Sequence, residues 1–354
     1  MPVPRDMRVV VCLLFLLCVT VLALPSWAQS PAKDHAKEQV ERQQTQPLNN
    51  APVWRDVRSS DTPPYQTSQV RGIETTVLVQ SQGEIWRQIR NGPITIYGGW
   101  LILAICAIIA AIYFLKGPIK LHGEPSGRML ERFNSIERVT HWTVAISFCL
   151  LGVTGLIILF GKYVLLPVFG YTLFSWLAIL SKNVHNFVAP VFALSLLVFI
   201  VIYIKDNLPE KGDLAWAMKG WRMFAGEHLP SGRFNAGEKV WFWVGVVLLC
   251  LVVIASGAIL LFPNFEQGRL LMQQANVIHA ISAVLVIGFS LGHIYMGTVG
   301  VEGAYQNMRT GLTDETWAKE HHEYWYNEVK GQAKPAGGAP SAVHASAMKE
   351  GWKL

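Results

Sequence analysis

The chain has 354 residues, of which 51% are hydrophobic and only 15% are charged. A soluble globular domain carries roughly 25% charged residues, so the composition argues against a water-soluble globule. The formal net charge is +6, but the charges lie between long apolar runs and form no single basic patch for nucleic acid. The composition therefore favours a membrane protein that contacts lipid and binds no nucleic acid.

Cysteine usage argues against two kinds of redox centre. Five cysteines occur, and no two of them form a C-x-x-C pair or a C-x-x-C-H motif. The spacing therefore predicts neither an iron–sulfur cluster nor covalently attached c-type haem on this chain.

Residues 1–28 are typical of a secretory signal peptide. Two arginines precede an apolar core, and the segment ends in the small-x-small sequence Ser26-Trp27-Ala28. The alternative is an uncleaved anchor helix, which the short core and Pro25 disfavour. We expect cleavage after Ala28.

Five apolar stretches follow a polar segment, residues 29–93, that is rich in Gln, Pro and Ser and is expected to have little core. Each stretch is close to the 20 or so residues that cross a bilayer as a helix. They cover approximately 94–115, 140–160, 185–204, 240–262 and 276–299. The sequence therefore predicts an all-α membrane protein with five transmembrane helices after a cleaved signal peptide.

Basic residues set the expected orientation of these helices. Lys and Arg gather in residues 116–139, in residues 205–239 and again in residues 300–354. The connections between the second and third helices and between the fourth and fifth contain few Lys or Arg residues. Basic connections remain in the cytoplasm under the positive-inside rule. We therefore expect a multi-pass protein of the bacterial inner membrane. Residues 29–93 are periplasmic in this orientation, residues 116–139 are a cytoplasmic linker, and residues 300–354 are a cytoplasmic C-terminal tail.

Four of the ten histidines lie within or at the rim of the predicted helices: His141, His185, His279 and His293. An ionisable side chain at that depth is costly and indicates a function by default. His141 opens its helix on the cytoplasmic side, and His185 opens the next helix on the periplasmic side. The 14 residues from His279 to His293 advance a helix by about 21 Å and nearly four turns, so both point to one face at opposite levels.

These depths predict two pairs, His141 with His293 at the inner level and His185 with His279 at the outer level. Neutral imidazoles on both faces of an iron porphyrin form a low-spin electron-transfer site, so two stacked b haems fit the pattern. One alternative is that the imidazoles only bond neighbouring helices to each other. Zinc is disfavoured because neither pair has a third or fourth ligand.

The connection before the fourth span contains FNAGEKVW, residues 234–241. Asn235 and Glu238 have the spacing of a capping box, which starts a helix. We also expect Asn235, Gly237 and Glu238 to contact a quinone, because amide and backbone donors beside a carboxylate suit a carbonyl and its incoming protons.

Other polar residues on the cytoplasmic side have weaker signals. Lys239 and His228 are candidates for delivering protons to that quinone. His321 and His322, within WAKEHHEYWY, are expected on the surface of a solvated helix and outside any site.

Several motifs together resemble the gamma, or cytochrome b, subunit of respiratory formate dehydrogenases. They are IERVTHW (136–142), NVHNF (183–187), DNLPEKGD (206–213), FNAGEKVWFW (234–243) and IHAISAVLVIGFSLGHIYM (278–296). The resemblance covers about residues 131–330 and implies a di-haem cytochrome b four-helix bundle over 140–299. It departs from the family at Glu238, where members often have Gln. Residues 29–130, which include the extra helix 94–115, are absent from the short members.

The resemblance implies an electron-transfer role in anaerobic respiration. Formate is then oxidised on a separate periplasmic alpha subunit that holds molybdenum or tungsten, and an iron–sulfur beta subunit passes the electrons on. They cross from the outer haem, held by His185 and His279, to the inner haem, held by His141 and His293, and reduce menaquinone or ubiquinone on the cytoplasmic side. This chain has no catalytic residue for formate oxidation. The alternatives are the cytochrome b subunit of a nickel–iron hydrogenase or related periplasmic oxidoreductase, and a haem-free membrane anchor.

Overall fold

The computed structural model describes residues 81–335 except 226, 228, 264 and 266. The signal peptide expected at 1–28 lies outside this part, as do the first residues of the polar segment up to residue 80. The described chain is mostly helical, and five of its helices are long and apolar enough to cross a membrane. They are Gly83–Leu115, Ser135–Val164, Leu166–Tyr203, Ala236–Leu261 and Arg269–Gly300. Each predicted stretch falls on one of these helices, and each helix begins before its predicted start.

The first of these helices begins within the polar segment 29–93, which the sequence predicts to be partly disordered with little core. It consists of α4 (Ser81–Ile89), the π-helical turn η2 (Arg90–Ile94) and α5 (Thr95–Leu115). Its segments η2 and α5 contact α11 (Arg269–Tyr295). The indole of Trp86, on α4, donates a hydrogen bond of 3.1 Å to Asn276 Oδ1.

The chain divides into two compact units. The smaller one includes Phe160–Ile179, which contains the end of α6 (Ser135–Val164) and the start of α7 (Leu166–Tyr203). Gly170 interrupts α7 with a φ of 71°, a left-handed conformation that costs little only for glycine. The element is therefore two helices that meet at this residue.

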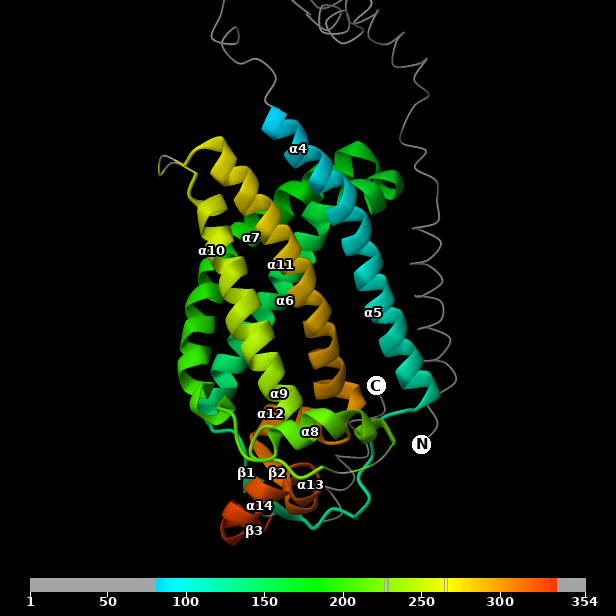
Figure 1. Ribbon diagram of the computed structural model, residues 1–354, viewed down its shortest axis with the longest axis vertical. Helices are drawn as coiled ribbons and strands as arrows, with labels where there is room; N and C mark the ends of the chain where they lie inside the picture. Colours follow the sequence, from blue (N-terminus) through cyan, green and yellow to red (C-terminus); the bar gives the residue numbers. More distant parts are fainter. Residues whose placement is uncertain (1–80, 226, 228, 264, 266, 336–354) are drawn as a thin grey trace, which may run out of the picture. The chain divides into compact units, whose positions relative to one another are not determined.

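The larger unit contains Ile85–Leu159 and the chain from Leu180 onward. In it, α6, α7, α11 and a fourth helix share one apolar core (Figure 1). The fourth helix is formed by α9 (Ala236–Val240), η5 (Trp241–Leu249) and α10 (Cys250–Leu261), and α11 ends in η6 (Met296–Gly300).

Side chains from three of these helices form the centre of that core. Phe192 and Leu196 of α7 meet Phe242 of η5 and Val286 of α11, and all four are buried. Other apolar side chains point outward, and Phe187 is 81% exposed. Apolar residues on both the inner and the outer faces are what a helix surrounded by lipid requires.

Segments that connect or follow the spanning helices fold together into a small layer outside the spans. Three short antiparallel strands form a sheet in the order β2-β1-β3. They are β1 (Arg128–Glu131), β2 (Leu312–Asp314) and β3 (Lys334–Pro335). The helices of this layer are η3 (Lys205–Asn207), α8 (Asp213–Lys219), η4 (Gly220–Ala225), α12 (Ala304–Thr310), α13 (Glu315–His321), α14 (Glu323–Val329) and η7 (Lys330–Gln332).

This layer differs from the sequence prediction, which gave an all-α chain with a linker at 116–139 and a tail after 299. The linker supplies β1, and the described part of the tail supplies both of its partners. Strands of two to four residues have too few positions to reveal an alternating pattern, so their pairing depends on residues that are distant in sequence.

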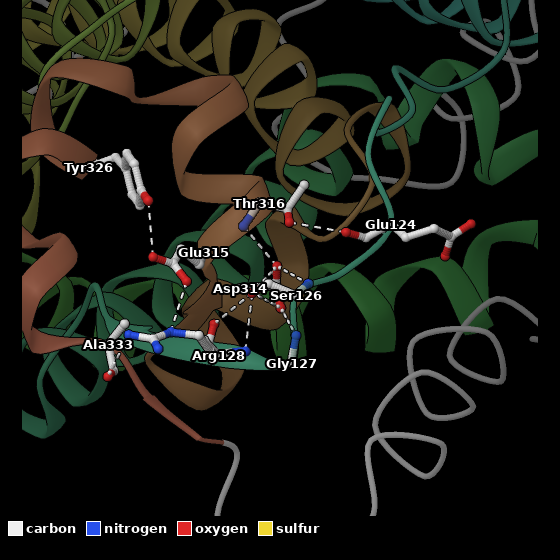
Figure 2. A network of polar contacts seen from close by, with 9 residues as sticks. All are labelled: Glu124, Ser126, Gly127, Arg128, Asp314, Glu315, Thr316, Tyr326 and Ala333. Carbon is white, nitrogen blue, oxygen red and sulfur yellow. Dashed lines mark hydrogen bonds and ion pairs between the residues drawn. The ribbon is translucent and has the colours of Figure 1, made fainter.

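A buried carboxylate holds the two segments of the layer together (Figure 2). Asp314 is 2% exposed and accepts hydrogen bonds from the backbone N–H of Ser126 at 3.0 Å, Gly127 at 2.9 Å and Thr316 at 2.8 Å. The last of these bonds caps α13. The neighbouring Glu315 is paired with Arg128 at 3.0 Å. Several N–H donors stabilise one buried carboxylate, so Asp314 is an anchor of this layer.

Replacing Asp314 by Ala is expected to lower the free energy of local unfolding of the layer by about 1–3 kcal/mol, because buried N–H donors lose their acceptor. Hydrogen exchange followed by mass spectrometry on peptides from 124–131 and 312–321 measures this change. Asp314→Asn is the matched control, since it keeps one acceptor oxygen and is expected to lose less. Equal protection in Asp314→Ala and the unmodified protein would contradict this role.

Candidate functional site

Two pairs of imidazoles face each other between the helices of the larger unit. The ring centres of His141, on α6, and His293, on α11, are 6.4 Å apart. Those of His185, on α7, and His279, on α11, are 6.2 Å apart. The structure therefore brings together the same two pairs that the sequence predicts from depth. We call them the loop-side pair (His141 and His293) and the distal pair (His185 and His279).

The spacing of both pairs fits a single iron atom between two imidazoles. An imidazole nitrogen binds a metal at about 2 Å, so two imidazoles on opposite faces of one iron hold their ring centres about 6 Å apart. Among the described residues, no group of three or more His, Cys, Asp or Glu is arranged to hold a metal ion. Two nitrogen ligands suit a metal whose remaining ligands come from a porphyrin.

Hydrogen bonds select the tautomer of the distal pair. Nδ1 of His279 lies 3.0 Å from the carbonyl oxygen of Val253, which only accepts, so Nδ1 carries the proton. Nδ1 of His185 lies 2.9 Å from Thr154 Oγ1, whose own proton goes to the Leu150 carbonyl at 2.7 Å. Both rings therefore donate from Nδ1 and keep Nε2 as a neutral ligand atom, the usual arrangement of metal-binding histidines.

A glycine beside each distal imidazole makes room for the ring. A Cβ atom at Gly155 would lie 3.4 Å from His185 Cε1, and one at Gly257 would lie 3.1 Å from His279 Cε1. Ser256, which precedes Gly257, also lies 3.2 Å from His279 Nδ1. A hydroxyl residue followed by glycine thus occurs beside both rings, a repeated signal that the sequence analysis did not use.

The loop-side pair has different neighbours. Trp241 stacks on His293 with ring centres 5.1 Å apart and an angle of 16° between the planes. Nδ1 of His141 is buried and has no hydrogen-bond partner within the described part of the chain.

A cavity of about 360 Å³ lies beside the loop-side pair. His293 and Trp241 line it, and so do Asn235, Gly237 and Glu238, the three residues that the sequence associates with a quinone. Its volume lies within the range of about 300–1,000 Å³ that is typical of ligand pockets. The wall also includes residues that the sequence analysis did not assign to the site: Arg132, Trp317, Glu320, His321 and His322.

The predicted capping box is present at the cavity wall. Asn235 Oδ1 accepts a hydrogen bond from the backbone N–H of Glu238 at 3.0 Å, and Glu238 Oε2 accepts one from that of Asn235 at 2.8 Å. The second carboxylate oxygen, Oε1, lies 3.3 Å from Arg132 Nη2. Both oxygens of Glu238 are therefore engaged, whereas the cap leaves the Nδ2 donor of Asn235 for a ligand.

Of the two residues expected to deliver protons to a quinone, Lys239 and His228, the structure describes only Lys239. Lys239 is buried and paired with Asp213 at 2.9 Å and Glu210 at 3.4 Å, and it is not among the residues that line the cavity. Its position agrees with a structural ion pair and not with proton delivery. His228 lies outside the described residues.

The expectation that His322 lies on a solvated helix surface is wrong. Its side chain is 2% exposed, and its Nδ1 lies 2.8 Å from the Gly232 carbonyl while Nη2 of Arg132 lies 2.9 Å from the ring at Nε2. The residue follows the last residue of α13 with a φ of −140°, so the chain leaves the helix there and turns the ring inward. Helical periodicity across WAKEHHEYWY does not reveal that break.

Burial governs the charges of this wall. It lowers the pKa of Arg132, an effect that the nearby Glu238 carboxylate opposes. Burial, followed by the charge of Arg132, holds the pKa of His322 well below its ordinary value. His322 is therefore a neutral ring that donates from Nδ1 to Gly232 and accepts from the Arg132 guanidinium at Nε2.

The lowered pKa of His322 predicts a pH-dependent stability of the α13 region. When that region opens, the freed imidazole titrates near pH 6.5, whereas the buried ring stays neutral to a much lower pH. The contribution of the neutral His322 ring to the stability of this region is fully present above pH 6.5 and is lost as the pH falls toward the pKa of the buried ring. Hydrogen exchange of residues 312–326, corrected for intrinsic rates, should show less protection at pH 5.5 than at pH 7.5. His322→Gln should reduce this difference, and an unchanged difference would contradict the assignment.

Comparison with known proteins indicates the family of the chain. The family model described as prokaryotic cytochrome b561 matches residues 132–311, about half of the chain. The nitrate-inducible formate dehydrogenase cytochrome b556(Fdn) subunit of Escherichia coli K12 is 30% identical over 214 residues, which are 58% of this chain and 95% of that protein.

Two further relatives carry similar names. The formate dehydrogenase cytochrome b556(fdo) subunit of the same organism is 31% identical over 208 residues, which are 56% of this chain and 92% of that protein. The formate dehydrogenase cytochrome b556 subunit of Haemophilus influenzae is 27% identical over 56% of this chain and 82% of its own. The resemblance inferred from the motifs is thus confirmed. The chain is a multi-pass membrane protein that belongs to the prokaryotic cytochrome b561 family, a membership that implies haem b and electron transport.

Proposed function

We propose that the chain is the membrane cytochrome b subunit of a formate dehydrogenase complex and carries electrons through two b haems to a quinone. The observation that carries this proposal is the presence of two facing imidazole pairs at two levels along α11, one of them beside a cavity. The formate dehydrogenase relatives, most of whose length this chain matches, support the choice of complex.

Four histidines of this chain would hold the two haems. His141 and His293 hold one haem, and His185 and His279 hold the other. Each haem, when bound, supplies one-electron redox chemistry. The Nδ1 hydrogen bonds of the distal pair orient its rings and leave Nε2 for the iron. The 14 residues from His279 to His293 separate the two levels by about 21 Å along α11.

Electrons enter at the distal pair, which faces the periplasm of the bacterial inner membrane. An iron–sulfur beta subunit delivers them from an alpha subunit where molybdenum or tungsten oxidises formate, so this chain needs no formate chemistry of its own. The basic segments 116–139, 205–239 and 300–354 support this orientation, with the mature N-terminus in the periplasm after loss of residues 1–28.

The quinone, menaquinone or ubiquinone, is reduced in the cavity beside His293. The Asn235 amide and the backbone N–H groups of its loop supply donors to a carbonyl oxygen, and Glu238 holds the loop through the cap. Two electrons and two protons convert the quinone into a quinol. Protons taken up from the cytoplasm, opposite the side where formate is oxidised, contribute to the membrane potential.

Substitution of one histidine at a time tests the pairing. His141→Gly or His293→Gly should abolish only the loop-side haem, and His185→Gly or His279→Gly only the distal haem, because each iron loses one of its two ligands. Pyridine haemochrome assays and redox titrations of the purified complex measure which haem remains. Added imidazole should restore the missing signal in a folded variant, and His122→Gly, outside the spans, is the control. If His141→Gly and His279→Gly each lost the same haem and kept the other, the pairing would be contradicted.

The quinone site is tested by a substitution that keeps the helix cap. Asn235→Asp preserves the Oδ1 acceptor that caps α9 and removes the Nδ2 donor, so both haems should still be reduced by formate. The rate of menaquinone reduction is expected to fall by about 10-fold, the loss of one hydrogen bond to a reacting carbonyl. Asn235→Ala is the comparison that also removes the cap. An unchanged rate in Asn235→Asp would exclude the amide from quinone reduction.

A further inference from the structure

One cation lines the cavity without a role in the function proposed so far. Arg132 is the only Lys or Arg among the described residues of the cavity wall, and it is 5% exposed. A buried guanidinium is costly unless its charge is compensated by partners or by a ligand.

Arg132 is rigidly held but incompletely paired. Its Nη2 lies 2.9 Å from the Arg233 carbonyl oxygen, 3.3 Å from Glu238 Oε1 and 2.9 Å from His322 Nε2. The same guanidinium lies over the ring of Trp317, 4.9 Å from its centre. Three acceptors share one nitrogen, whereas Nε is buried and has no partner within the described part of the chain. Arg132, which lines the cavity, therefore has one unused donor.

His322 fixes the position of the Arg132 guanidinium. Because its Nδ1 donates to the Gly232 carbonyl, its Nε2 is an acceptor and fixes one edge of the guanidinium. The ring centres of Phe133 and Trp317 lie 5.0 and 4.9 Å from the guanidinium carbon, and the two rings restrict the rotation of the guanidinium further. A preorganised donor of this kind lowers the energy of a charge that develops only during a reaction.

Quinone reduction develops such a charge. Conversion of a quinone into a quinol takes up two electrons and two protons, so a carbonyl oxygen carries negative charge whenever an electron precedes its proton. We propose that the Arg132 guanidinium donates a hydrogen bond to that oxygen and stabilises its charge, as a catalytic residue that His322 positions. This inference rests on the proposed quinone reduction.

A purely structural role for Arg132 makes a different prediction about binding. An arginine that only ties the 132–133 segment to the 231–238 loop affects neutral and anionic ligands alike. An arginine that faces the ligand prefers an anion. Two probes of similar ring size separate these roles: menadione, which is neutral, and 2-hydroxy-1,4-naphthoquinone, which is an anion at neutral pH.

The experiment measures binding of both probes to the complete, haem-loaded complex by equilibrium dialysis, and reduction of menadione with formate as donor. The unmodified complex should bind the anionic probe about 10-fold more tightly, as a hydrogen bond between charged groups allows. Arg132→Gln should abolish this preference and lower kcat for menadione about 100-fold with little change in KM. Arg132→Lys and His322→Leu should each lose part of the preference, and Arg138→Gln, an arginine outside the cavity wall, should lose none.

The outcomes separate this inference from the function on which it rests. Equal binding of the two probes by the unmodified complex would overturn the role of Arg132, and so would an unchanged preference in a haem-loaded Arg132→Gln complex. The first comparison needs no variant, so it decides the question even if Arg132→Gln does not assemble its haems. Failure of the unmodified complex to bind either probe or to reduce menadione would instead overturn the proposed quinone site.

Discussion

The structure depends on the cost of placing an ionisable side chain among apolar helices. Each of four spanning-helix imidazoles carries that cost, and each is placed opposite another imidazole. Three helices deliver these rings, and a fourth supplies the carbonyl of Val253 and the hydroxyl of Ser256 that orient His279. Helix packing thus brings both ring pairs together, and the hydroxyl and glycine positions serve the distal pair.

The two levels are built differently, and the difference agrees with different tasks. At the distal pair, hydroxyl and carbonyl groups engage Nδ1 of both rings, which suits a site that only passes electrons. At the loop-side pair, Trp241 stacks on His293 and a cavity lies alongside. The capping box and the Arg132–His322 contact bring polar groups to that cavity, as a site that exchanges both electrons and protons requires.

Residues whose positions follow from local rules could be predicted from the sequence. Apolar length predicts the five spans, the 3.6-residue period places His279 and His293 on one face, and the Asn235–Glu238 spacing predicts a capping box that is present. Arg132 and His322 could not be found in this way, because 190 positions separate them in sequence and only the fold brings them together. The short strands β1, β2 and β3 are missed for the same reason.

If the two imidazole pairs each hold one haem, the protein binds two b haems, and the haem stoichiometry decides this. A pyridine haemochrome assay on the purified, detergent-solubilised full chain, with protein determined by amino-acid analysis, gives the number of b haems per chain. Two b haems per chain are expected. One haem, or none, in a preparation whose helical content by circular dichroism matches the structure would contradict it.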